Sequence, residues 1–316
     1  MHVLITGATG FVGKTLTEYL LEKGLHVRAQ TRNLHNAAVI HSNLQWVETG
    51  EITANTNWTE ALDGVDVIVH LAQRAHVMKE TSESYVDHYR KVNVEAFENL
   101  ISQSVLAGTK KIIFLSSIKV NGEKTTTPFR ESDIPAPEDF YGMTKLEAEN
   151  VVKKYSARSE LKYTIIRPPL IYGRNVPGNF KKLIGLAASG IPLPLKSIRN
   201  RRSLVGVVNL CDFIETCIRL PEASNETFLV SDDYDLSTPE LISKISDAMN
   251  KKSRLIYFPT FLLRFLFLLT GKKNYSQRLL DSLQVNISKA KRVLNWNPPH
   301  TVDYDIRRAV RGFVEN

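Results

Sequence analysis

Several features that define other protein classes are scarce in this 316-residue sequence. Its two cysteines, Cys211 and Cys217, are too few for a disulfide framework and fit a reducing compartment. The histidines show no metal-ligand spacing, so we predict no metal site. No apolar run reaches the roughly 18–20 residues that span a bilayer, and the first residues lack the pattern of a signal peptide. The sequence therefore predicts a cytoplasmic protein.

The net charge of +8 raises the question of an anionic partner. The basic residues come in short, separated clusters rather than in a long stripe interleaved with aromatic residues, so we predict no nucleic-acid binding. We interpret most of these clusters as solvated faces. With 43% hydrophobic residues, the chain has the composition of a folded protein with a large core.

Short apolar segments alternate with amphipathic helical segments through the first half of the chain. We predict strands at 3–5, 27–31, 67–71, 112–115 and 163–167, and helices at about 12–23, 92–107 and 143–155. This alternation indicates βαβ units in a doubly wound, parallel sheet, which is a Rossmann-type α/β fold. After Pro169 the chain breaks into loops and short helices, and then a helix at 207–220 and a strand at 228–230 return to the sheet. We therefore predict two interleaved regions, one of residues 1–167 plus about 203–232, and a smaller one of about 168–202 and 233–316.

A glycine-rich turn, TGATGFVG at 6–13, follows the first predicted strand and opens the first helix. Glycines in that context permit a tight turn and let backbone amides approach a pyrophosphate, whose charge favours the helix N-terminus. The turn predicts dinucleotide binding, so the first region is the dinucleotide-binding domain and the second the substrate-binding region. The cofactor-binding candidates here are Gly7, Gly10, Phe11, Val12 and Gly13.

The end of the second predicted strand bears on the choice of cofactor. An acidic residue there would hold a ribose hydroxyl, but the stretch HVRAQTR at 26–32 contains none. Arg32, with Arg28 as a second candidate, could instead meet a 2′-phosphate, which favours NADP(H) over NAD(H). Glu51 and Ile52 are further candidates for contact with the adenine.

Tyr141 and Lys145 stand four residues apart on a predicted helix, so their side chains share one face. A phenol titrates near 10, and a neighbouring ammonium group lowers that pKa toward a useful range. Ser117, at the end of the strand predicted at 112–115, could hydrogen-bond the same substrate oxygen. Together with the glycine turn, these residues predict proton and hydride chemistry, with Ser117, Tyr141 and Lys145 as the catalytic residues.

The same motifs occur together in a known family. They are TGATGFVG, HLA at 70–72, VNVEAFENL at 92–100, LSSIKVNG at 115–122, YGMTK at 141–145, RPPLIYG at 167–173 and LNWNPP at 294–299. On these motifs the chain resembles the extended short-chain dehydrogenases/reductases of the nucleotide-sugar epimerase, dehydratase and reductase group. The resemblance implies that the tyrosine is the acid/base, the lysine holds the nicotinamide ribose and the serine orients the reacting oxygen. It also implies that further residues border the cofactor, namely Leu71, Ala72, Asn93 and Pro168.

Within that group, SSIKVNG at 116–122 and NRRSLV at 200–205 resemble bacterial enzymes that form UDP-N-acetylquinovosamine by reducing a 4-keto precursor. Two departures lower the weight of an epimerase: Asn121 stands where epimerases usually carry tyrosine, and the acid after the second strand is missing. For the substrate diphosphate the resemblance favours Arg202, because arginine binds phosphate oxygens in a fork, with Arg278 as a second candidate. Other residues that could line the substrate pocket are Gln73, Arg74, His76, Arg174 and Asn179; a surface salt bridge is an equal alternative for Arg174.

The predicted reaction is NAD(P)H-dependent reduction of the C4 ketone of a UDP-4-keto-6-deoxy-N-acetylhexosamine for surface-polysaccharide synthesis. The first alternative is a UDP-hexose 4-epimerase, acting on UDP-glucose or UDP-N-acetylglucosamine with bound NAD. A non-catalytic dinucleotide-binding sensor is disfavoured, because such proteins commonly lack an intact Tyr, Lys and Ser set. A steroid or flavonoid ketoreductase is disfavoured by Arg202 and by the 116–122 segment.

The strongly apolar segment at 261–269 is not explained by this chemistry. We expect a helix packed over the substrate region or at a subunit contact, with peripheral contact to a membrane as the alternative. A homodimer through the helices at about 92–107 and 143–155 is usual for the family and is also expected.

Overall fold

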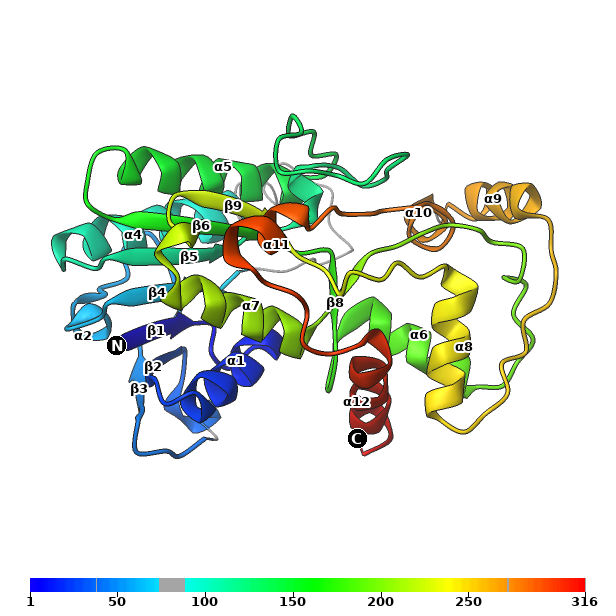
Figure 1. Ribbon diagram of the computed structural model, residues 1–316, viewed down its shortest axis with the longest axis horizontal. Helices are drawn as coiled ribbons and strands as arrows, with labels where there is room; N and C mark the ends of the chain where they lie inside the picture. The colour runs from blue at the N-terminus through cyan, green and yellow to red at the C-terminus, as the bar shows by residue number, and fades with distance from the viewer. Residues whose placement is uncertain (38, 74–88, 272, 316) are drawn as a thin grey trace.

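The centre of the molecule is a seven-stranded parallel sheet (Figure 1). The computed structural model describes residues 1–37, 39–73, 89–271 and 273–315. The strand order is β3-β2-β1-β4-β5-β6-β9, and every neighbouring pair is parallel. The predicted Rossmann-type fold is therefore confirmed. The strands are β1 (His2–Thr6), β2 (His26–Thr31), β3 (Leu44–Glu48), β4 (Val67–His70), β5 (Lys111–Leu115), β6 (Lys162–Arg167) and β9 (Glu226–Leu229).

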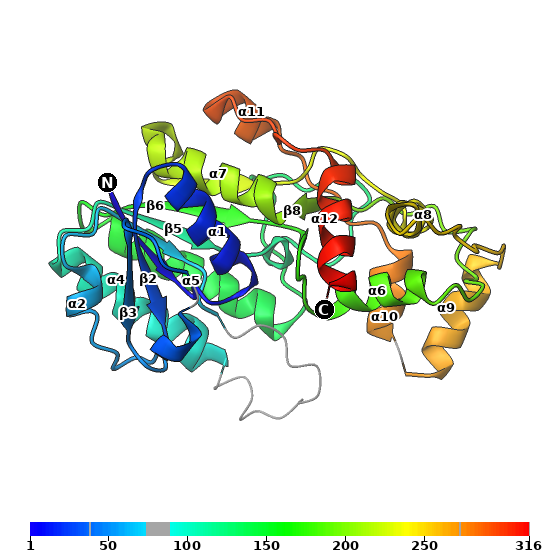
Figure 2. The ribbon, with the colours of Figure 1, turned by 90° about the horizontal axis from the view of Figure 1, so that it is seen from below.

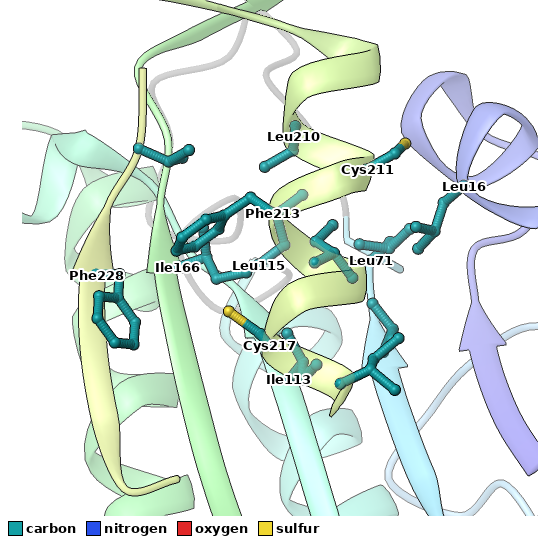
Figure 3. Close-up of a cluster of buried hydrophobic side chains, with 14 of the residues drawn as sticks. Leu16, Leu71, Ile113, Leu115, Ile166, Leu210, Cys211, Phe213, Cys217 and Phe228 are labelled. Atoms are coloured by element: carbon teal, nitrogen blue, oxygen red, sulfur yellow. The ribbon is translucent and has the colours of Figure 1, made fainter. Parts of the chain in front are cut away.

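Helices cover both faces of this sheet because its strands are apolar on both sides. One face is covered by α1 (Phe11–Glu22), α7 (Val207–Arg219) and α11 (Ser288–Leu294), and the other by α2 (Thr59–Leu62), α4 (Ala96–Leu106) and α5 (Phe140–Ser156). Figure 3 shows Phe213 and Cys217 of α7 directed at side chains of the strands, such as Ile113 and Ile166. Cys211 and Cys217 are both buried and free, and they contribute to the core as small apolar side chains.

The second region has a core of its own beyond the carboxyl ends of the strands (Figure 2). A two-stranded parallel sheet of β7 (Leu170–Tyr172) and β8 (Leu204–Gly206) leads into it. The helices are α6 (Gly178–Ala188), α8 (Thr238–Ala248), α9 (Thr260–Leu269), α10 (Lys273–Leu280) and α12 (Val302–Val314). At the start of α8, Ser237 and Glu240 form a capping box that satisfies two backbone amides. No helix in the described part of the chain is long and apolar enough to cross a bilayer.

The differences from the predicted elements include one edge strand and the starts of two helices. The edge strand β3 was not predicted, because LQWVE is half polar and short. The helix predicted at 92–107 begins as a wide π-type turn, η2 (Lys91–Glu95), before α4. The helix predicted from 143 begins at Phe140, so that Tyr141 and Lys145 both lie within α5. The division into domains at 167 and 203 stays a prediction.

Candidate active site

The glycine turn lies at the end of β1, where the strand order reverses between β1 and β4. Gly7 has a φ of +69°, and a Cβ there would lie 2.9 Å from the backbone nitrogen of Ala72. A Cβ at Gly13 would lie 2.1 Å from the carbonyl oxygen of Gly7. Glycine is therefore required at both positions. The turn also packs directly against the end of β4, where a ligand is expected in an open α/β sheet.

The N-terminus of α1 fits a pyrophosphate. Its N-cap residue is Gly10, so no side chain satisfies the first amides of the helix. Gln30, which the sequence analysis missed, fixes the turn from β2. Its Oε1 accepts from the backbone nitrogen of Gly7 at 2.9 Å, and its Nε2 donates to Thr49 Oγ1 at 2.9 Å. A preorganised turn in front of an uncapped helix is suited to bind a dinucleotide phosphate.

The residues expected at the ribose and adenine differ in how freely they could reach a ligand. Arg32 is exposed directly after β2. The expectation for Arg28 is wrong, because its guanidinium donates to Gln45 and to the backbone carbonyls at the end of α2. That group closes the helix C-terminus instead of facing a cofactor. Glu51 is exposed after β3, and Ile52 packs partly against the core.

The three residues predicted to be catalytic lie around the N-terminal half of α5. Asp139 caps this helix by accepting from the backbone nitrogen of Gly142 at 2.8 Å, and the first turn then carries Tyr141. The hydroxyl of Tyr141 donates to Gln73 Oε1 at 3.3 Å. Nζ of Lys145 lies 6.0 Å from the Tyr141 ring centroid and donates to the carbonyl of Leu115 at 2.7 Å. The structure thus brings the predicted tyrosine, lysine and strand end together.

Burial controls the protonation of this pair. It raises the pKa of the Tyr141 hydroxyl well above its usual value, the charge of Asp139 raises it further, and hydrogen bonds with Gln73 and Ser117 oppose the shift. It lowers the pKa of Lys145 to about 7, against the opposing charge of Glu149. The lower phenol pKa expected from the neighbouring lysine is therefore not found, because burial outweighs it. The protonated form of Lys145 can still stabilise a phenolate, and a lysine that titrates near neutrality can also take part in proton transfer.

A buried ion pair, which the sequence analysis did not predict, supports the strand ends behind the residues predicted to be catalytic. Glu149 of α5 accepts from Arg167 of β6 at 2.6 and 2.9 Å and from Ser116 Oγ at 2.6 Å. The remaining Arg167 nitrogen donates to Asn121 Oδ1 at 2.9 Å. Asn121 therefore has a structural partner in this chain. The backbone nitrogen of Ile118 also donates to the carbonyl of Pro168 at 3.0 Å, which ties the Ser117 segment to the end of β6.

Arg202 lies half-buried where three segments meet. Its backbone pairs with Leu236 and Leu283, and its Nη1 donates to the carbonyl of Asp281 at 2.9 Å. Burial lowers the pKa of Arg202, the charges of Asp281 and Glu123 oppose that shift, and Arg278 adds to it. The two predicted diphosphate ligands, Arg202 and Arg278, are therefore close enough to interact.

The other residues expected at the site lie on separate elements of the structure. Asn179 is exposed in the first turn of α6. Arg174 forms an exposed ion pair with Glu315 at 2.9 Å, which is the alternative considered for it. Asn93 is buried within the wide turn η2. Arg74 and His76 lie outside the described residues. Within the described ranges, no cluster of three or more His, Cys, Asp or Glu side chains could hold a metal ion.

Known proteins resemble this chain over nearly its whole length. A UDP-glucose 4-epimerase of Vibrio cholerae is 40% identical over 317 residues, covering 99% of this chain and 95% of the relative. An N-acetyl-alpha-D-glucosaminyl-diphospho-ditrans,octacis-undecaprenol 4-epimerase of Escherichia coli O157:H7 is 29% identical over 260 residues, 82% of this chain and 75% of the relative. The crystal structure of UDP-glucuronic acid 4-epimerase from Bacillus cereus in complex with NAD matches with a TM-score of 0.81 at 20% identity, covering 100% of this chain and 99% of that chain.

A family model identifies the class of protein. The model of the NAD dependent epimerase/dehydratase family matches residues 3–231, which contain the glycine turn, Ser117, Tyr141 and Lys145. The predicted resemblance to the nucleotide-sugar epimerase group, the predicted enzyme class and the predicted cofactor, NADP(H) or NAD(H), are thereby confirmed. The chain belongs to the NAD dependent epimerase/dehydratase family.

Proposed function

We propose that this protein is a UDP-hexose 4-epimerase that inverts C4 of the sugar with NAD held in its crevice. The observation that carries the proposal is the 40% identity to a UDP-glucose 4-epimerase over 99% of this chain. This identity favours the epimerase over the 4-ketoreductase that the sequence motifs predicted first. The intact set of Ser117, Tyr141 and Lys145 argues against a non-catalytic sensor.

In the proposed reaction, the glycine turn at 6–13 and Lys145 would hold NAD, which when bound would supply the acceptor and the donor of the hydride at C4. The Tyr141 hydroxyl, as phenolate, takes the proton of the C4 hydroxyl and gives it back when the ketone is reduced. Lys145 supports the phenolate, and Ser117 hydrogen-bonds the same oxygen. Gln73 Oε1, 3.3 Å from the Tyr141 hydroxyl, accepts from that hydroxyl only while Tyr141 is protonated, so this bond breaks when the phenolate forms.

For the carrier of the sugar we propose a nucleoside diphosphate. Arg202 and Arg278 supply two neighbouring guanidinium groups that suit a diphosphate. The relative that acts on an undecaprenol-linked sugar shares the same diphosphate chemistry. It is less similar to this chain, however, at 29% identity over 82% of it.

A 4-ketoreductase is the second candidate, and one observation favours it. Arg32 is exposed after β2, in a stretch without an acidic residue. Such a site favours NADPH, which supports net reduction. An epimerase needs no added reductant, because the hydride it removes is returned to the substrate.

We also propose a homodimer through the outer faces of α4 and α5. Phe140 and Met143 on α5 are exposed, and the ion pair of Arg90 with Glu147 lies beside them. Light scattering on the purified protein would measure the mass directly, and a monomer at micromolar concentration would contradict this proposal.

The test of the proposed function is an assay of the purified protein without added cofactor. We expect it to interconvert UDP-glucose and UDP-galactose, or their N-acetylated forms, without a change in nicotinamide absorbance. Loss of added NADPH on a UDP-4-keto-6-deoxy sugar, with no epimerisation, would establish the ketoreductase instead.

A further inference from the structure

Helix α9 presents an apolar surface that nothing in the described chain covers. The large apolar side chains Phe261 (70% exposed), Phe265 (55%), Leu268 (66%) and Leu269 (66%) are more than half exposed. With 3.6 residues per turn, they fall on the side of α9 opposite to Leu263, which is buried. We name as the apolar end surface the set Ile256, Tyr257, Phe261, Leu262, Phe265, Leu266, Leu268 and Leu269.

The segment that carries this surface also carries almost the whole net charge of the protein. Residues 248–280 contain seven of the 41 basic residues and none of the 33 acidic ones, so the rest of the chain has 34 basic and 33 acidic residues. Lys252 and Arg254 are exposed in the irregular segment that leads to α9, and Arg264 is half-exposed on the helix itself. The apolar side chains are therefore flanked by positive charge.

The position of α9 is compatible with a large, flat partner. It lies at the end of the molecule farthest from the parallel sheet (Figures 1 and 2). It is also connected to the proposed substrate site, because Arg264 pairs with the Asp281 carboxylate at 2.6 Å and the Asp281 carbonyl accepts from Arg202 at 2.9 Å. A partner bound at α9 would therefore lie on the substrate side of the molecule.

We propose that the apolar end surface docks on an anionic lipid bilayer. An amphipathic helix with basic flanks inserts its apolar side at the level of the headgroups, while the basic residues bind the negative surface. A second copy of the chain is the competing partner. It is disfavoured because a symmetric contact would bring the exposed basic residues of two copies, such as Lys252 and Arg254, near each other. The helix is only 10 residues long, so it lies on the membrane and does not cross it.

Co-sedimentation of the full chain with vesicles tests this proposal. We expect binding to phosphatidylglycerol-containing vesicles, weaker binding to phosphatidylcholine vesicles, and a decrease as salt is raised. The double variant Phe265→Glu/Leu269→Glu should lower the affinity at least about tenfold, because it places charge in the apolar side. The variant Lys252→Gln/Arg254→Gln should lower binding to anionic vesicles about tenfold and leave phosphatidylcholine binding unchanged.

A matched control is Val314→Glu, which changes an apolar residue that is 72% exposed at the end of α12. It should bind vesicles like the wild type. All variants should keep turnover of a soluble UDP-sugar, so failure of docking and failure of the proposed function are measured separately. Absence of wild-type binding, or unchanged binding by Phe265→Glu/Leu269→Glu, would overturn the proposal. A dimer that this variant dissociates, without vesicle binding, would assign the surface to a second copy.

Discussion

The two regions of the molecule place their charged and apolar groups in different ways. In the sheet region, the buried Glu149 is matched by Arg167 and Ser116, Arg167 also donates to Asn121, and the apolar side chains of the sheet are covered on both faces. In the substrate region, both carboxylate oxygens of the buried Asp305 lack a hydrogen-bond partner among the described residues, and α9 leaves its apolar side exposed.

In the sheet region the buried charges are fixed by partners, whereas the second region leaves charged and apolar groups without a partner among the described residues. The paired network fixes the strand ends that carry Ser117 and Pro168, which agrees with a site that needs preorganised groups. The region predicted to bind substrate contains an unpaired carboxylate, whose protonation depends on pH, and an uncovered helix, which a membrane could bind. The predictions below test this contrast, from the largest expected effect to the smallest.

The largest effect is expected at Tyr141, in the sheet region. Tyr141→Phe removes the proposed acid/base, and turnover should fall about 100- to 10,000-fold. Bound NAD should be retained, which the absorbance of the denatured protein would show. Tyr155→Phe, on the same helix but far along it, is the matched control and should keep its activity. Near-normal turnover by Tyr141→Phe would show that another group moves the proton.

The buried network should respond strongly to loss of one partner. Glu149→Gln leaves the Arg167 charge buried without its carboxylate, so the free energy of unfolding should fall by about 3 to 5 kcal/mol in urea titrations. The double variant Glu149→Leu/Arg167→Met should recover much of that loss, because no uncompensated charge remains. A single variant as stable as the wild type would mean that the network contributes little.

In the substrate region, Arg202→Met should mainly weaken substrate binding. Loss of a charge-assisted contact to a diphosphate corresponds to about a tenfold rise in KM, with a smaller change in kcat. Calorimetric titration with UDP should show the same loss. Arg201→Met, which removes the exposed neighbouring arginine, is the control and should bind UDP normally. Equal KM values for the two variants would remove Arg202 from the site.

Asp305 should make the stability of the substrate region depend on pH. Burial, with a smaller contribution from the charge of Asp232, raises its pKa to about 7 in the folded state from 3.8. The folded state therefore binds more protons than the unfolded state between these values. Stability falls as pH rises through that window. Asp305→Asn does not titrate, so its free energy of unfolding relative to that of the wild type should increase between pH 4 and pH 8.

Thermal unfolding of wild type and Asp305→Asn across that range provides the measurement. A difference that stays constant with pH would show that Asp305 is paired in solution. A difference that shrinks as pH rises would reverse the sign of the argument.

The sequence predicted what depends on local patterns. The strand predicted at 3–5, the glycine turn and the helix predicted at about 12–23 follow from local patterns, and the face shared by Tyr141 and Lys145 follows from their spacing. All of them occur in the structure, with the strand at His2–Thr6 and the helix at Phe11–Glu22. The pairing of Glu149 with Arg167 and the position of Asp305 against Gly206 were missed, because they depend on residues that meet only after folding. Arg28 was misassigned for the same reason, because the backbone carbonyls at the end of α2 that bind its guanidinium lie more than 30 residues away in the sequence.

Retention of the hydride tests the central claim most directly. UDP-glucose that carries deuterium at C4 would be converted by the purified protein without added cofactor, and the product analysed by mass spectrometry. An epimerase that returns the same hydride predicts UDP-galactose with the deuterium still at C4. Product that has lost the deuterium, or conversion only when NADPH is supplied, would contradict the proposed function.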